Sequence, residues 1–304
     1  MKILVTGVTG YVGSLVAPRL LRDGHDVTGF ARHPSRVELP IQVTEGDAVT
    51  GAGLDQALAG VDVAYFLIHS MERSSNGAFD ANERAAAENF ARAARGAGVK
   101  RIVYLGGLVP AGGPVSLHLA SRLEVEKILL AACPDSVAFR ASIAIGARSR
   151  SFKFLVRLVE RMPVLILPAW STHVTRTIDE RDLIEILARA ATSAEVAGES
   201  LDLGGPDVVS YGELIDRIRH HMLVDRPTLA LPRLTLTPIA SRISSLIANE
   251  DPALMEPLME SLNEELLPRD DRAAKLLGVR LHSLDSSIER ALRDLEAHQP
   301  LAAR

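Results

Sequence analysis

Three glycines near the start of the chain have the spacing that binds a diphosphate. Gly7, Gly10 and Gly13 follow a short apolar run, Lys2 to Thr6, and precede a stretch with helical apolar spacing. A strand, a glycine turn and a helix N-terminus in this order present backbone N–H groups and a positive dipole end to a dinucleotide pyrophosphate. Gly7 allows the tight turn, Gly10 the approach of the phosphates, and Gly13 close packing of the helix. A purely structural turn is the alternative interpretation.

Two arginines follow the next strand-like run, Asp26 to Ala31. Arg32 and Arg36 lie where such a fold contacts the adenosine ribose, and no Asp or Glu stands directly at the strand end. A free 2′-hydroxyl usually pairs with a carboxylate here, whereas a 2′-phosphate pairs with arginine. The pattern favours NADP over NAD as the cofactor, with a solvated basic turn as the alternative.

Polar residues also follow the next two predicted strands. Asp47 comes after a strand at 41–44, where it could accept from the adenine amino group or cap a helix at 51–58. His69 and Ser70 follow a strand at 61–68 and would line the crevice near the pyrophosphate and nicotinamide. A hydrogen-bonded packing role is the alternative for His69.

One further pair could move a proton. His118 and Arg122 are four residues apart in a predicted helix, so they share one helix face. A nearby cation disfavours the protonated imidazole, so the charge of His118 could change near neutral pH, which suits a proton donor or acceptor. The alternative is a surface pair that only binds phosphate or water.

Strands and helices alternate through the first half of the sequence. The predicted strands are short apolar runs at 2–6, 26–31, 41–44, 61–68, 101–105 and 136–140. Helical spacing lies between them, most clearly over 79–95. The alternation predicts an α/β fold with a Rossmann-type, doubly wound parallel sheet. Pro18 predicts a kink in the first helix, with an early end of that helix as the alternative.

The regular alternation of strands and helices ends in the second half of the chain. Helical and extended segments alternate less regularly there. Helices are predicted over 152–162, 181–191 and 211–222, and extended segments over 163–170 and 200–203, the second of these a strand. Residues 229–267 have helical apolar spacing interrupted by prolines. We therefore expect a dinucleotide-binding domain over 1–148, completed by 173–204. A smaller, mostly helical lobe would consist of 149–172 and 205–304.

The composition argues against several classes of partner. The chain has 304 residues, a net charge of −4, 47% apolar residues and no long basic run, which disfavours nucleic acid as the main partner. No apolar run reaches the roughly 18 residues of a membrane span, and no leader precedes Ile3, so a cytoplasmic location is expected. The single cysteine, Cys133, lies in an apolar helix tail and is expected to be a buried thiol. No metal site is predicted.

Together, these motifs resemble the extended and atypical branches of the short-chain dehydrogenase/reductase superfamily. The resemblance rests on Thr6 to Gly13, on Asp47 and on the strand at 101–105. More narrowly, segments 65–71, 86–91, 103–108 and 203–207 look like those of NmrA-like, YbjT-type NAD(P)H-binding proteins. The implied cofactor-binding residues are Gly7, Thr9, Gly10, Tyr11, Val12, Gly13, Arg32, Arg36, Asp47, Ala48, Ile68, His69, Ser70, Gly106 and Arg122.

The chain departs from the superfamily pattern at the reacting groups. The resemblance implies a serine after the fifth strand, and a proton-moving tyrosine with a lysine four residues later. Gly106 or Gly107, His118 and Arg122 occupy these positions. Arg122 could hold the ribose hydroxyls, although a guanidinium differs in shape from an ammonium, and His118 could move a proton.

Two functions from different classes fit this pattern. The first is an NADP-dependent oxidoreductase with His118 and Arg122 as catalytic residues. Phe152, Phe154 and Trp170, in apolar segments, then suggest a hydrophobic carbonyl, enone or quinone-like substrate. The second is a non-catalytic NADP(H)-binding redox sensor or accessory protein, whose proline-broken lobe would bind a protein partner. An epimerase or lyase that keeps its cofactor bound is a further alternative.

Overall fold

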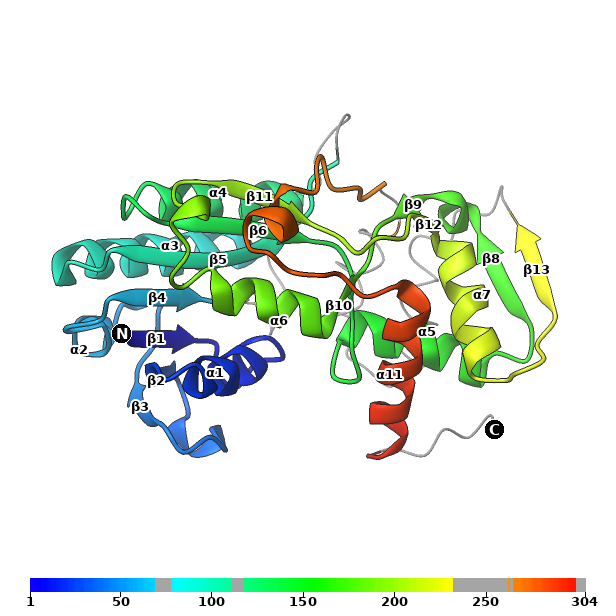
Figure 1. Cartoon of the computed structure of the whole chain (residues 1–304), viewed down its shortest axis with the longest axis horizontal. Coiled ribbons are helices and arrows are strands. Elements are labelled where there is room, and N and C mark those ends of the chain that lie inside the picture. The colour runs from blue at the N-terminus through cyan, green and yellow to red at the C-terminus, as the bar shows by residue number, and fades with distance from the viewer. Residues whose placement is uncertain (69–77, 111–116, 232–261, 263–264, 299–304) are drawn as a thin grey trace.

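A seven-stranded parallel sheet forms the centre of the molecule's amino-terminal part (Figure 1). The computed structural model of the chain describes residues 1–68, 78–110, 117–231, 262 and 265–298. The strands lie in the order β11-β6-β5-β4-β1-β2-β3. Their bounds are β1 (Lys2–Thr6), β2 (Asp26–Ala31), β3 (Gln42–Glu45), β4 (Val63–Phe66), β5 (Arg101–Gly107), β6 (Val137–Ala141) and β11 (Ser200–Leu203). The order reverses at β1, which confirms the predicted doubly wound α/β fold.

Helices cover both faces of this sheet (Figure 1). One apolar core joins α1 (Gly13–Arg22) and α6 (Glu180–Arg189) to one face. Another joins α2 (Leu54–Leu58), α3 (Ala78–Ala97) and α4 (Leu117–Leu130) to the opposite face. Successive strand side chains point to opposite faces, so Ile3 and Val5 of β1 enter the first core and Leu4 enters the second. All three are fully buried, which explains why β1 reads as an unbroken apolar run.

The first helix continues through its proline. Helix α1 runs from Gly13 to Arg22 with Pro18 inside it, so the alternative of an early end is wrong, and the kink stays a prediction. Cys133 is 4% exposed, as expected for a buried thiol, and burial raises its pKa.

A third apolar core lies beside the carboxyl end of the sheet (Figure 1). Its main helices are α5 (Arg150–Arg161), α7 (Tyr211–His221) and α11 (Leu284–Glu296). Phe152, Phe154 and Trp170 are buried in this core, with exposed fractions of 0%, 3% and 8%. These aromatic side chains therefore pack the core of the lobe. They do not support the inference of a hydrophobic substrate.

Three two-stranded sheets complete this region, and the remaining short elements connect them. The pairs are β7 (Ala144–Ile145) with β10 (Ile178–Asp179), β9 (Val174–Thr175) with β12 (Val209–Ser210), and β8 (Leu165–Pro168) with β13 (Thr228–Leu231). The short helices are η1 (Pro34–Arg36), η2 (Ala169–Thr172), η3 (Ala194–Val196) and α10 (Arg272–Leu276). The helical prediction for 229–267 is wrong at 229–231, which is strand, and residues 232–261 lie outside the described part of the chain.

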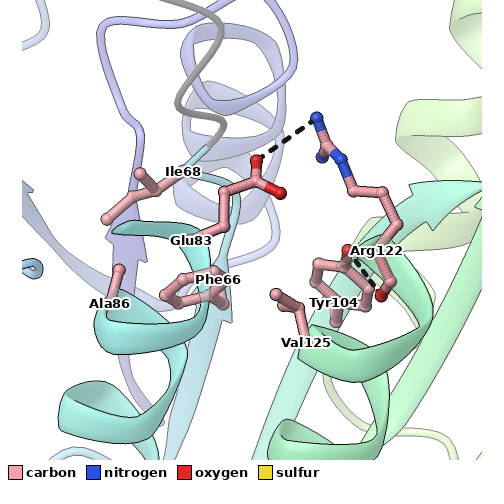
Figure 2. A pocket seen from close by; sticks show the side chains of 7 residues that line it. All are labelled: Phe66, Ile68, Glu83, Ala86, Tyr104, Arg122 and Val125. Carbon is pink, nitrogen blue, oxygen red and sulfur yellow. Dashed lines mark hydrogen bonds and ion pairs between the residues drawn. The ribbon is translucent and has the colours of Figure 1, made fainter. Parts of the chain in front are cut away.

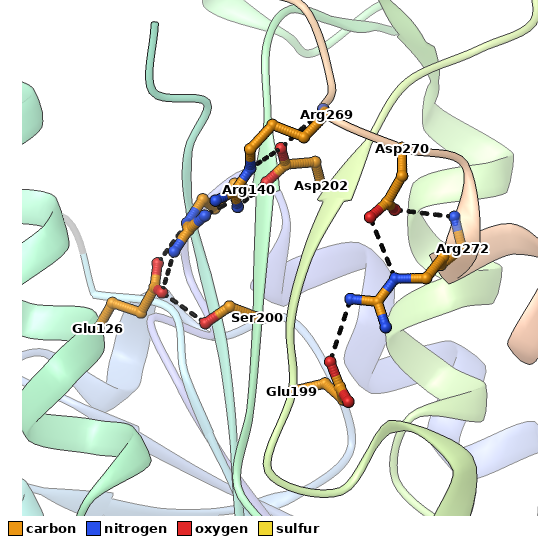
Figure 3. Close-up of polar contacts among 8 residues, drawn as sticks. All are labelled: Glu126, Arg140, Glu199, Ser200, Asp202, Arg269, Asp270 and Arg272. Atoms are coloured by element: carbon orange, nitrogen blue, oxygen red, sulfur yellow. Dashed lines mark hydrogen bonds and ion pairs between the residues drawn. The ribbon is translucent and has the colours of Figure 1, made fainter. Parts of the chain in front are cut away.

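A network of charged side chains fixes α4 against the sheet (Figure 3). Arg140 of β6 donates through Nε to Glu126 of α4 at 2.7 Å, and its Nη1 lies 3.4 Å from Asp202 of β11. Arg269 donates to the same Asp202 carboxylate at 2.7 and 2.8 Å. Glu126, Arg140 and Asp202 are at most 8% exposed, and buried charges need such partners. The network therefore holds the position of the helix that carries His118 and Arg122.

Candidate functional site

The glycine loop has the conformation that its sequence predicts. Gly7 has φ +65°, and a Cβ there would lie 2.4 Å from the carbonyl oxygen of Leu67. A Cβ on Gly13 would lie 2.3 Å from the Gly7 carbonyl oxygen. The Gly10 N–H donates to that same oxygen at 2.8 Å and closes the turn. Side chains at positions 7 and 13 would therefore collide with the backbone.

The backbone just before α1 and at its first residue offers N–H groups to an outside partner. The helix N-cap, Val12, provides no side-chain hydrogen bond, and the first turn contains no acidic residue. The N–H groups of Ser14 and Leu15 already donate to the carbonyls of Gly10 and Val12, at 3.0 and 3.1 Å. No described backbone carbonyl accepts from the N–H groups of Tyr11, Val12 and Gly13, so an anion is their natural acceptor. Thr9 and Gly10, just before this turn, are exposed. The predicted diphosphate site thus has the required donors.

Thr6 connects the glycine loop to the end of β4. Its hydroxyl donates to the Tyr65 carbonyl at 2.9 Å and accepts from the Leu67 N–H at 3.1 Å. The ends of β1 and β4 are thereby fixed at the point where the strand order reverses. Ile68 follows directly, and the predicted site residues His69 and Ser70 lie outside the described residues.

The predicted adenosine side is the end of β2 and β3. Arg32 follows β2 directly and Arg36 ends η1, and both residues are exposed. Asp47 follows β3, and its carboxylate accepts from the Val49 N–H at 2.8 Å. Helix α2 begins only at Leu54 and has no side-chain cap, so the helix-cap alternative for Asp47 is wrong.

Asn89 of α3 holds the loop that contains Asp47. Its Nδ2 donates to the carbonyl oxygens of Ala48 and Val49 at 3.1 and 2.8 Å. Ala48 is buried at 4% exposure. This segment is therefore fixed beside the sheet edge that also carries Arg32. Sequence reasoning missed Asn89, because a helical asparagine gives no sign of which loop it contacts.

A small cavity lies where β4 and β5 face α3 and α4 (Figure 2). Its volume of about 10 Å³ is room for about one water molecule. Arg122 of α4 and Glu83 of α3 form an ion pair at its rim, with 3.5 Å between Nη2 and Oε1. The other lining residues are Phe66, Ile68, Ala86, Tyr104 and Val125.

The Glu83–Arg122 pair is almost fully buried. The two side chains are 5% and 8% exposed, so the alternative of a surface pair is wrong for Arg122. The Ser121 hydroxyl donates to the other Glu83 oxygen at 3.3 Å. The Tyr104 hydroxyl donates to the Arg122 carbonyl at 3.4 Å, and burial raises the pKa of Tyr104 to about 12, so it keeps its proton at neutral pH. Glu83 and Tyr104 therefore position Arg122 from two sides.

The other positions that the superfamily pattern singles out lie on β5 and α4, two of the elements that line this cavity. His118 lies in the first turn of α4, four residues before Arg122, and its side chain lies outside the described part. Gly106 and Gly107 are the last residues of β5, which extends two residues beyond its predicted end. A Cβ on Gly106 would lie 3.0 Å from the Tyr104 ring, so even a serine there would crowd it.

The fold and the glycine loop define a protein with a dinucleotide-binding domain, and comparisons with known proteins agree. Residues 7–123 match the sequence profile of a family described as NAD(P)H-binding. The match and the fold confirm the predicted resemblance. Residues 7–123 are thus similar to an NAD(P)H-binding domain, and the fold agrees with the resemblance to atypical short-chain dehydrogenases/reductases. Among the described helices, none has the length and apolar character to cross a membrane.

Curated relatives include several reductases. The chain is 27% identical over 176 residues to a ceramide reductase of Caulobacter vibrioides, covering 57% of this chain and 55% of that protein. It is 24% identical over 271 residues to a (4-alkanoyl-5-oxo-2,5-dihydrofuran-3-yl)methyl phosphate reductase of Streptomyces griseus, covering 86% of each. The matched region thus spans about half of the first of these relatives and most of the second.

Solved structures share the whole fold at lower identity. The crystal structure of gox2253 has a TM-score of 0.75 and 22% identity, with 99% of each chain covered. A UDP-glucuronic acid 4-epimerase from Bacillus cereus in complex with NAD also has a TM-score of 0.75, at 16% identity, with 100% of this chain and 99% of that one covered. This likeness establishes the architecture.

Proposed function

We propose that the chain is an NADP(H)-dependent oxidoreductase that reduces a small molecule at a carbonyl or an activated carbon–carbon double bond. One observation carries the proposal. At the carboxyl ends of the central strands, the N–H groups of Tyr11, Val12 and Gly13 have no described backbone acceptor, and a buried Arg122 is held by a carboxylate. Relatives named as reductases support reduction, although their named substrates differ from one another.

Each end of the cofactor would meet a different set of groups. The backbone of Gly7 to Gly13 would bind the pyrophosphate, Arg32 and Arg36 the 2′-phosphate, and Asp47 the adenine. When bound, the cofactor supplies the hydride. Arg122 would hold the nicotinamide ribose, a role that suits a guanidinium fixed by Glu83. His118 would transfer the proton that accompanies the hydride. The substrate would lie under the lobe predicted at 149–172 and 205–304.

Cofactor choice is tested by calorimetric titration of the folded protein with NADPH and NADH. Arg32→Asp should weaken NADPH binding at least about tenfold more than NADH binding, because it replaces a cation by an anion at the 2′-phosphate. Arg22→Asp, the same change at an exposed arginine in the last turn of α1, is the control and should leave the ratio unchanged. Equal affinities for both coenzymes in the unmutated protein would refute the role of Arg32.

Hydride transfer is tested by following NADPH oxidation with a panel of carbonyl, enone and quinone compounds. With an accepted substrate, His118→Ala should lower kcat at least about tenfold. His298→Ala, which removes an exposed histidine near the chain end, should not lower it. Tight NADPH binding without turnover of any compound would instead favour the non-catalytic sensor or accessory role, which the absent serine, tyrosine and lysine motivate.

A further inference from the structure

Three distant segments of the chain meet beside the glycine loop. Tyr11 lies within that loop, Gly146 follows β7, and Glu180 is the first residue of α6. A Cβ built on Gly146 would lie 2.2 Å from Glu180 Oε2 and 2.5 Å from Tyr11 Oη. The two oxygens therefore converge on the same point, and a side chain at position 146 would displace both. This contact is the only reason in the described structure for a glycine there, because its φ is not in the left-handed region.

The tyrosine and the glutamate are half-buried and face each other beside the loop. The Tyr11 hydroxyl interacts electrostatically with the Glu180 carboxylate, and neither Tyr11 Oη nor Glu180 Oε2, both buried atoms, has a well-formed hydrogen bond to any described residue. Burial raises the pKa of Glu180, and the nearby Tyr11 hydroxyl only partly opposes this. Burial and the Glu180 charge raise the pKa of Tyr11, which therefore remains a donor. A carboxylate with so few donors is costly to keep in a buried place.

We propose that Tyr11 and Glu180 are a positioning pair for the dinucleotide. The pair holds the glycine loop in the conformation that presents the amides of Tyr11, Val12 and Gly13 to the pyrophosphate, while the charge of Glu180 weakens the binding of that anion. This inference rests on the proposed cofactor site. The reason for a positioning role is that the backbone of Tyr11 belongs to the glycine loop, whereas its hydroxyl lies beside the Glu180 carboxylate of α6.

The other charges around Glu180 are of both signs. Asp179 is paired with Arg181, whose Nη2 lies 2.6 Å from its carboxylate. On α11, Arg290 and Asp294 are paired at 3.3 Å and affect Glu180 with opposite signs. Arg148, which is exposed, acts on the Tyr11 side. Among the described residues no cation forms an ion pair with Glu180, so its own charge dominates the field behind the loop.

The test is calorimetric titration with NADPH of the full-length protein and three variants. Tyr11→Phe should raise the Kd about fivefold or more, because it removes the hydroxyl that faces Glu180 behind the loop. Tyr65→Phe is the matched control, because the Tyr65 hydroxyl bonds to α6, at the Leu187 carbonyl (2.7 Å), but lies in β4. It should change the Kd less than about twofold.

Glu180→Gln keeps the shape of the side chain and removes its charge. It should lower the Kd about threefold at pH 8, where the wild-type carboxyl is ionised. In the wild type, NADPH affinity should rise as the pH falls toward the raised pKa of Glu180, because protonation removes the unfavourable charge. That part of the pH dependence should be absent in Glu180→Gln. The pH profile of this variant therefore still tests the positioning pair if Tyr11→Phe fails to fold.

The outcomes separate this inference from the proposed function. Equal Kd changes in Tyr11→Phe and Tyr65→Phe, or the same pH profile in the wild type and Glu180→Gln, would overturn the positioning pair while leaving the cofactor site in place. Failure of the folded wild type to bind either coenzyme would overturn the proposed function first, and the positioning pair with it.

Discussion

The two sides of the proposed cofactor site use different kinds of interaction. On the glycine-loop side, residues 7–13 use backbone N–H groups, a helix end and two positions where no Cβ fits. On the α3–α4 side, Glu83, Tyr104 and Arg122 use a buried ion pair and a tyrosine hydroxyl. Backbone donors are present whatever the side chains are, whereas an ion pair depends on both of its members. The first side can therefore persist while the second changes its chemistry.

This difference explains where the chain departs from the pattern of the superfamily that it resembles. The glycine spacing matches the expected pattern, and the departures fall at Gly106 or Gly107, His118 and Arg122, at the end of β5 or on α4. At these positions a substitution is accommodated by a partner on a neighbouring element, as Glu83 of α3 shows for Arg122. The fold thus keeps nucleotide binding while the reacting groups vary.

The largest effect should come from breaking the buried pair. Arg122→Met leaves the Glu83 carboxylate, 5% exposed, without its cation, and should lower the free energy of unfolding by about 3–5 kcal/mol. Urea unfolding followed by circular dichroism measures this loss. The double variant Glu83→Gln with Arg122→Met should regain at least about half of it, because no uncompensated charge remains. If the double variant were as unstable as Arg122→Met, the pair would not be the source of the cost.

A smaller but more local effect should come from the glycine-loop side. Gly13→Ala places a Cβ 2.3 Å from the Gly7 carbonyl oxygen, so the loop must shift, and the Kd for NADPH should rise about a hundredfold. Gly96→Ala in α3 is the matched control, because no atom lies within 4 Å of its Cβ position. It should leave the Kd unchanged and leave stability equal or slightly higher. Equal losses of affinity in both variants would show that the loop geometry is not what binds the cofactor.

Much of the sheet could be predicted from the sequence, because a strand buried on both faces is a continuous apolar run. The bounds of β1 and β2 agree with the predicted runs at 2–6 and 26–31. Pairing between distant segments could not be predicted in this way. Strand β13 pairs with β8 in the register Leu229 with Ile166, and nothing in the apolar spacing at 229–231 distinguishes this from a helix. Strand β5 similarly extends to Gly107 because that residue pairs with Ala141 of β6.

In the candidate site, too, residues whose role depends on nearby sequence positions could be predicted, and residues whose role depends on distant positions could not. Gly13 could be predicted because its Cβ would collide with Gly7 and Val8, a few positions away, and Gly7 because the turn itself requires its φ of +65°. Glu83 could not, since it lies beside Arg84, which forms ordinary surface ion pairs, and its partner is 39 positions away in the sequence. Gly146 was missed for the same reason, because the atoms that require a glycine belong to Tyr11 and Glu180.

The smallest effect should lie at the adenosine end, where a side chain supports a backbone loop. Asn89→Ala removes two hydrogen bonds to the Ala48 and Val49 carbonyls and should raise the Kd for NADPH about threefold, with a stability loss of about 1 kcal/mol. Arg92→Ala is the control, since its contact with Asn89 at 3.2 Å is exposed. Adenosine 2′,5′-bisphosphate, which lacks the nicotinamide half, should show the same threefold loss, because the supported loop contains only Asp47 and its neighbours. If Asn89→Ala weakened the binding of NADPH but not of this fragment, the Asp47 loop would not contact the adenosine half of the cofactor. The part of the site built from backbone groups would then not include this loop.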